Sequence, residues 1–182
     1  THFVPQIARS LEIAVRGGLR IPLIYNTNAY DSVDVLRLLE GIIDIYLPDL
    51  KYGDADLANS YSKIPDYPRH ARSAIVEMHR QVGSELVIGE DGVVKRGLII
   101  RHLVLPNDLA GSKESLRWVR TELGQQVTMS IMSQYFPTHK ALTTELLDRK
   151  LRPSEYERAL TYLDSLGMEN GWVQEYEASE YY

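Results

Sequence analysis

Residues 43–54 read IDIYLPDLKYGD, an apolar run that ends in an acid and a base two positions apart, Asp49 and Lys51. The run is rich in β-branched and aromatic residues, so it predicts a buried strand. In an extended chain, residues i and i+2 point to the same side. The carboxylate and the ammonium group should therefore face one way at the end of the strand, where they would suit a ligand with charges or hydroxyl groups. A solvated strand end, with Asp49 capping the next turn, is the alternative.

The rest of the chain alternates between short apolar runs and segments of helical periodicity. Expected strands cover residues 21–25, 42–50, 98–106 and 127–132, and the tail from residue 171 is strand-like. Expected helices cover residues 6–16, 31–39, 67–81, 116–123 and 153–166, with a short helix or turn at residues 54–61. Residues 85–97 are an exception, because Glu90-Asp91-Gly92 between two alternating runs predicts a β-hairpin. The run at residues 21–25 is apolar throughout, as in a strand that is buried on both faces.

This order predicts an α/β fold in which helices wrap a parallel sheet, either an open doubly wound sheet or a (β/α) barrel, complete or partial. The chain contains no glycine-rich loop of the GxGxxG or GxxxxGK type, which counts against a nucleotide-binding doubly wound fold. Its 182 residues are enough for one well-filled core and too few for two, so residues 1–182 should form a single domain.

The composition excludes several functions. A net charge of −5 gives no basic surface for nucleic acid, and no apolar run approaches the roughly 20 residues that span a bilayer. No signal peptide opens the chain, so a cytoplasmic location is expected. The absence of cysteine excludes disulfides, a thiol nucleophile, a zinc site with thiolate ligands and an iron-sulfur cluster held by this chain alone. The chain begins with Thr1 and a helix, so we expect it to be a piece of a longer protein.

Ligands of parallel α/β proteins bind at the carboxyl ends of the strands, where the loops converge. The polar residues at those ends are therefore candidates: Asn26, Thr27, Asn28, Asp49, Lys51, Ser133, Gln134 and Tyr135. Residues 26–28 would also suit an ordinary turn with Asx caps. The third strand carries Arg101 and His102 next to each other. Alternation sends one of the two into the interior, and a buried guanidinium is costly unless it meets an anion.

Four segments, in this order and at these separations, carry a resemblance to a known family. They are YNTNAYDS at residues 25–32, DIYLPDLKYGD at 44–54, RGLIIRHLVLPNDLAGS at 96–112 and MSIMSQYFP at 129–137. With them, the chain resembles the radical S-adenosylmethionine (SAM) proteins that are similar to pyruvate formate-lyase activating enzyme. The likeness extends over nearly the whole chain.

The resemblance implies a partial (β/α) barrel, a radical SAM barrel that lacks its first strands. In that family a [4Fe-4S] cluster binds SAM through the amino and carboxylate groups of its methionine part. An electron from the cluster cleaves SAM to methionine and a 5'-deoxyadenosyl radical, which abstracts a hydrogen atom from a substrate. In activating enzymes the substrate is a backbone glycine of a glycyl radical enzyme, and a reductant such as flavodoxin or ferredoxin supplies the electron. The full-length protein is thus expected to be a radical SAM oxidoreductase.

The resemblance also assigns roles to single residues. The Asp-x-Lys of the family corresponds to Asp49 and Lys51, which hold the ribose and the carboxylate region of SAM. Arg101 corresponds to an arginine that faces the SAM pocket, and Gln134 lies where another strand delivers a polar side chain to it. Asn26 stands in place of an acid that helps activating enzymes to hold a monovalent cation. The expected SAM-binding residues are Asn26, Thr27, Asp49, Lys51, Arg101 and Gln134, and no catalytic residue or metal ligand is assigned.

This chain lacks two segments of the family, the CxxxCxxC loop that ligates the cluster and the Gly-Gly-Glu type segment that meets the amino group of SAM. We therefore expect residues 1–182 to be the C-terminal part of a radical SAM protein, with Thr1-His2-Phe3 similar to the residues just past its second strand. Alone, such a chain should hold no cluster and should not cleave SAM. Missing barrel strands leave an exposed edge, so we also expect self-association through that edge.

Two other functions remain as alternatives. The first is a cysteine-free, barrel-like binding module for a small ligand or a protein, without redox chemistry. The second is an aldolase in which Lys51 forms a Schiff base. The aldolase is disfavoured, because a carboxylate beside Lys51 stabilises the charged amine, whereas a Schiff base requires the neutral one.

Overall fold

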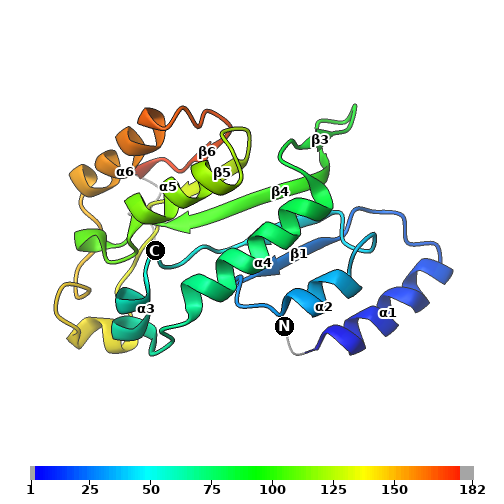
Figure 1. Cartoon of the computed structure of the whole chain (residues 1–182), viewed down its shortest axis with the longest axis horizontal. Helices are drawn as coiled ribbons and strands as arrows, with labels where there is room; N and C mark the ends of the chain where they lie inside the picture. Colours follow the sequence, from blue (N-terminus) through cyan, green and yellow to red (C-terminus); the bar gives the residue numbers. More distant parts are fainter. Residues whose placement is uncertain (1–2, 177–182) are drawn as a thin grey trace.

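Five parallel strands form the sheet of the computed structural model, which describes residues 3–176 (Figure 1). In chain order they are β1 (Ile24–Thr27), β2 (Ile45–Pro48), β4 (Val94–Leu103), β5 (Thr128–Met132) and β6 (Gly171–Val173). A short strand, β3 (Val87–Ile88), pairs antiparallel with β4. The turn between β3 and β4 closes with a hydrogen bond from Gly92 N to Gly89 O, so the predicted hairpin is confirmed.

Helices alternate with these strands, and the predicted α/β fold is confirmed. The helices are α1 (Val4–Arg16), α2 (Val33–Leu38), α3 (Ala55–Ser62), α4 (Tyr67–Val82), α5 (Ser112–Glu122) and α6 (Pro153–Ser165), with 3-10 turns at Pro106–Asp108 and His139–Thr143. The longest, α4, packs across β2 and β4 (Figure 1). Expectations for Thr1, His2 and the end of the tail, residues 177–182, lie outside the described residues.

The order of the strands separates the two architectures that the sequence leaves open. A doubly wound sheet reverses its strand order at a switch point. Here the parallel neighbours follow chain order from β1 to β6 without a reversal. Because crossovers between parallel strands are right-handed, this order places the connecting helices on a single face of the sheet. The arrangement is that of an open arc of a barrel, in agreement with the predicted partial barrel.

Burial along the strands shows that one face of the sheet is covered and the other is open. In β4, Leu98, Ile100 and His102 are fully buried, whereas Arg101 between them is partly exposed. The expectation of a strand buried on both faces at residues 21–25 is wrong. The strand lies at Ile24–Thr27, and the side chain of Ile24 is 59% exposed because it points to the open face.

Among the described residues, β1 is bonded to β2 and its outer edge carries no partner strand. We expect the chain to self-associate through this edge at high concentration, because the edge strand of a sheet is a template for pairing with another chain. Light scattering over a concentration series should show dimers or larger species. Ile24→Lys should weaken the association, since a charge on an edge strand opposes pairing. A chain that stays monomeric over the whole series would count against this prediction.

Between residues 3 and 176, none of the helices combines the length and the apolarity that crossing a membrane requires.

Candidate functional site

A cleft of about 410 Å³ opens at the carboxyl ends of β2, β4 and β5. Its volume lies within the range of roughly 300–1,000 Å³ that is usual for small-molecule sites. Four of the six predicted SAM-binding residues line it: Asp49, Lys51, Arg101 and Gln134. Three tyrosines, Tyr52, Tyr61 and Tyr135, line it as well. The cleft therefore lies where ligands of parallel α/β proteins bind, and it combines charged groups with aromatic rings.

The backbone at the end of β2 places the acid and the base on the same side. Asp49 N donates to Thr27 O at 2.8 Å, and Leu50 N donates to Arg101 O at 2.8 Å, so the chain continues past the strand in extended form. Leu50 is buried in the core, whereas Asp49 and Lys51 on either side of it reach the cleft. The i, i+2 alternation predicted from residues 43–54 is thus confirmed.

Arg101 meets an anion in the cleft rather than in the interior. Its Nε and Nη2 atoms each lie 2.7 Å from Asp49 Oδ1, and Nη2 also donates to Asn26 Oδ1 at 2.8 Å. The two charged side chains are 27% and 23% exposed, so water screens the pair and its contribution to stability is small. The contacts fix positions instead, because the guanidinium on β4 holds Asn26 of β1 and Asp49, the residue that follows β2.

Lys51 gives the cleft a second cation. Its Nζ lies 3.5 Å from Asp49 Oδ2, and its side chain is 48% exposed. Two cationic groups with one carboxylate leave an excess of positive charge, which suits a ligand that carries a carboxylate.

The remaining candidates differ in how close they come to the cleft. Gln134 lines it; its amide oxygen accepts from Gln174 Nε2 at 3.4 Å, and its amide nitrogen donates to the sulfur of Met132 at 3.7 Å. Asn26 does not line the cleft but reaches it through its hydrogen bond with Arg101. The structure does not bring the Thr27 hydroxyl to the cleft.

Thr27 is instead bound by an acid that sequence reasoning passed over. Its hydroxyl donates to Asp31 Oδ2, and Tyr25 Oη donates to Asp31 Oδ1 at 3.0 Å. Asp31 is largely buried, and burial of the neighbouring ring raises the pKa of Tyr25. Sequence reasoning could have predicted this contact, because Asp31 follows Thr27 by four residues, in the turn after β1.

His102 is the member of the Arg101-His102 pair that enters the interior. It is fully buried, and burial lowers the pKa of its imidazole, which is therefore neutral. Its Nδ1 donates to Leu50 O at 2.7 Å, and its Nε2 accepts from the Ser112 hydroxyl at 2.9 Å. Both ring nitrogens are satisfied, so His102 ties the end of β2 to the start of α5 and has a structural role.

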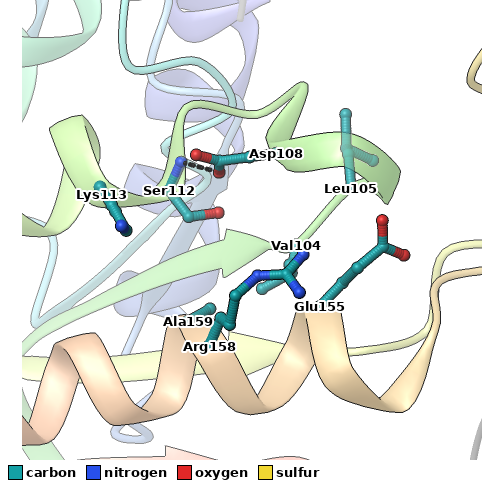
Figure 2. Close-up of a pocket in the computed structure, with 8 residues that line it drawn as sticks. All are labelled: Val104, Leu105, Asp108, Ser112, Lys113, Glu155, Arg158 and Ala159. Carbon is teal, nitrogen blue, oxygen red and sulfur yellow. Dashed lines mark hydrogen bonds between the residues drawn. The ribbon is translucent and has the colours of Figure 1, made fainter.

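A second, smaller cavity of about 150 Å³ lies between the start of α5 and α6 (Figure 2). Both acids in its wall already have partners, since Asp108 accepts from Ser112 N at 2.8 Å and Glu155 is bound by Arg149 and by Asn107 N. Within residues 3–176, no three histidine or acidic side chains come close enough together to hold a metal ion. The larger cleft is therefore the stronger candidate.

Comparison with known proteins identifies a relative but no activity. The chain is 30% identical over 149 residues to the uncharacterized protein MJ0674 of Methanocaldococcus jannaschii. The matched region is 82% of this chain and 40% of that protein, so the chain spans about two fifths of the length of this relative. No family model matches the chain, and no solved structure matches it.

Proposed function

We propose that this chain supplies part of the SAM site of a radical SAM oxidoreductase of the activating-enzyme-like kind. The observation that carries the proposal is the gathering of Asp49, Lys51 and Arg101 in one cleft at the carboxyl ends of β2 and β4. These residues come from two of the sequence segments that resemble the family, and the open arc of parallel strands agrees with its partial barrel.

The residues of the cleft fit the chemical groups of SAM. The Asp49 carboxylate can accept hydrogen bonds from ribose hydroxyls, and the cations of Lys51 and Arg101 can attract the carboxylate of the methionine part. Tyrosine rings in the wall offer flat apolar surface to adenine, because aromatic rings stack on one another. The role of this chain would be to bind and orient SAM and to exclude water from it.

The residues of this chain do not fit the cluster. The chain contains no cysteine, so the cluster ligands must come from a segment outside these 182 residues. With a reduced [4Fe-4S] cluster bound, proteins of this family generate a 5'-deoxyadenosyl radical from SAM. The radical's substrate, a glycyl radical enzyme as partner, flavodoxin or ferredoxin as reductant and a cytoplasmic location all remain parts of the proposal.

The proposal predicts that the protein encoded by the longest reading frame containing this chain forms 5'-deoxyadenosine from SAM. The protein is expressed without oxygen, reconstituted with iron and sulfide, and incubated with SAM and dithionite, and the product is measured by liquid chromatography. The 182-residue chain treated in the same way should give none, because it lacks cysteine ligands. A protein that is shown to hold a cluster and still forms no 5'-deoxyadenosine would contradict the proposal.

The lack of cysteine favours a second candidate, a binding module that keeps a barrel-like scaffold without redox chemistry. The two candidates differ in what precedes Thr1 in the gene. Three cysteines at CxxxCxxC spacing upstream would favour the radical SAM protein, whereas a start codon immediately before Thr1 would favour the module.

A further inference from the structure

Tyr67, the first residue of α4, places its hydroxyl between the ends of β1 and β2. The hydroxyl lies 2.9 Å from Asn28 O and 2.7 Å from Asp49 O, to which it donates, and it accepts from Lys51 N at 2.9 Å. The residue is only 4% exposed. Burial raises its pKa, so the hydroxyl keeps its hydrogen near neutral pH. One buried group thus contacts three backbone atoms from two loops.

These three backbone atoms lie just past the point where the β1–β2 ladder ends. The last paired residues are Thr27 and Pro48. The hydroxyl continues the connection between the two strands beyond this pair, where their backbones lead into different loops. Partly buried backbone groups also need hydrogen-bond partners, so providing one is a first function of Tyr67.

The contacts of the Tyr67 hydroxyl also affect the cleft. Of the backbone atoms that Tyr67 binds, the oxygen of Asp49 and the nitrogen of Lys51 belong to the two residues whose side chains carry the charges of the site. The Tyr67 ring also packs perpendicular to that of Tyr52, at 5.8 Å between ring centres, and Tyr52 lines the cleft. The same residue therefore touches the backbone of the charged pair and one aromatic wall.

We propose that Tyr67 is a positioning residue for SAM: its hydroxyl fixes the backbone of Asp49 and Lys51 so that the carboxylate and the ammonium group face the ligand. This inference rests on the proposed function for the identity of the ligand. It goes beyond that function because Tyr67 lies behind the cleft and lines none of it.

The test removes the hydroxyl and keeps the ring, in the variant Tyr67→Phe. We expect the dissociation constant for SAM, measured by calorimetry on the cluster-containing protein that the longest reading frame encodes, to rise on the order of tenfold, because small displacements of positioning groups have large effects. Amide hydrogen exchange at Lys51 should become at least about tenfold faster, since its N–H loses its acceptor. Exchange at Leu50, whose N–H donates to Arg101 O, should not change.

Tyr46→Phe is the matched control. Tyr46 is fully buried, and its hydroxyl donates to Gln81 Oε1 at 2.6 Å on the face of the sheet that the helices cover. This variant loses a buried hydrogen bond of the same kind, so its melting temperature should fall comparably. Its affinity for SAM and its exchange at Lys51 should stay at the wild-type values.

The outcomes separate this inference from the function on which it rests. Wild-type affinity for SAM in Tyr67→Phe would overturn the positioning role, as would an equal loss of affinity in Tyr46→Phe. If the wild-type protein with its cluster fails to bind SAM, the proposed function fails, and unchanged exchange at Lys51 in Tyr67→Phe would then overturn the positioning role independently. Should Tyr67→Phe not fold, 3,5-difluorotyrosine at position 67, whose oxygen is a weaker acceptor, replaces it with the same two measurements.

Discussion

Replacing Glu155 by glutamine is expected to lower the free energy of unfolding by about 2 kcal/mol, the scale of a net hydrogen bond to a charged group. The carboxylate of Glu155 is 6% exposed and accepts from Arg149 Nη1 and Nη2, both at 2.8 Å. It also accepts from Asn107 N at 2.8 Å and from Arg152 N at 2.9 Å. Glutamine keeps one oxygen and introduces an NH₂ group that faces donors, so at least two of these contacts are lost.

The same carboxylate should make stability depend on pH in the acid range. The Arg149 guanidinium, followed by backbone N–H groups, lowers the pKa of Glu155 from 4.5 to about 2. Arg80 and Gln81 lower the pKa of Glu77 to about 2 as well. A carboxyl group whose pKa is lower in the folded state stabilises the fold above pH 4.5, and this stabilisation is lost as the pH falls toward 2. Melting temperature should therefore fall over this range, less steeply in Glu155→Gln than in the wild type.

An exposed ion pair provides the control. Asp91 lies 2.7 Å from Lys95, but the two side chains are 56% and 39% exposed. Asp91→Asn should change the free energy of unfolding much less than Glu155→Gln does, because water screens such pairs. Urea unfolding followed by circular dichroism measures both variants. Equal effects of Glu155→Gln and Asp91→Asn would contradict the role given to the buried carboxylate.

The parts of the site that were predicted from sequence are those set by local geometry. The directions of Asp49 and Lys51 follow from alternation within one extended segment, and the structure agrees. The same rule predicted that one of the neighbours Arg101 and His102 points into the interior and the other away from it. Alternation did not identify which one, because that choice depends on which face of the sheet the helices cover, a property of the whole chain.

The misses share a physical reason, namely that their partners lie elsewhere in the sequence. Tyr67 looks like an ordinary aromatic residue at a helix start, and its hydroxyl meets backbone groups 16, 18 and 39 residues away. Thr27 was assigned to the ligand from a resemblance, but the turn after β1 brings Asp31 back to its hydroxyl. The start of β1 was placed too early because Ile21 and Leu23 extend the apolar run without joining the ladder.

Replacing Arg101 by glutamine is expected to raise the dissociation constant of the cluster-containing protein for SAM on the order of 100-fold. Hydrogen bonds to charged groups are strong, and two effects of the substitution combine. The first effect is the loss of one of the two cations that attract the carboxylate of SAM. The second is the release of Asp49 and Asn26, which the guanidinium holds in place. Stability should change little, because the ion pair is partly exposed.

A second substitution at this position separates the two effects. Arg101→Lys keeps the positive charge, but an ammonium group lacks the planar fork that reaches two acceptors at once. Its dissociation constant should therefore rise less than that of Arg101→Gln, on the order of tenfold. Equal losses in both variants would mean that positioning of Asp49 dominates. Wild-type affinity in Arg101→Lys would mean that charge alone is sufficient.

Arg120→Gln is the control, because it also removes an arginine that donates hydrogen bonds, but at a position outside the cleft. Arg120 donates to Leu166 O at 2.9 Å and to Gln125 Oε1 at 3.2 Å, away from the residues that line the cleft. Calorimetric titration with SAM should give wild-type affinity for this variant. A dissociation constant for Arg101→Gln within about twofold of the wild-type value would mean that SAM binds without the ion pair between Arg101 and Asp49, and the proposed site would have to be abandoned.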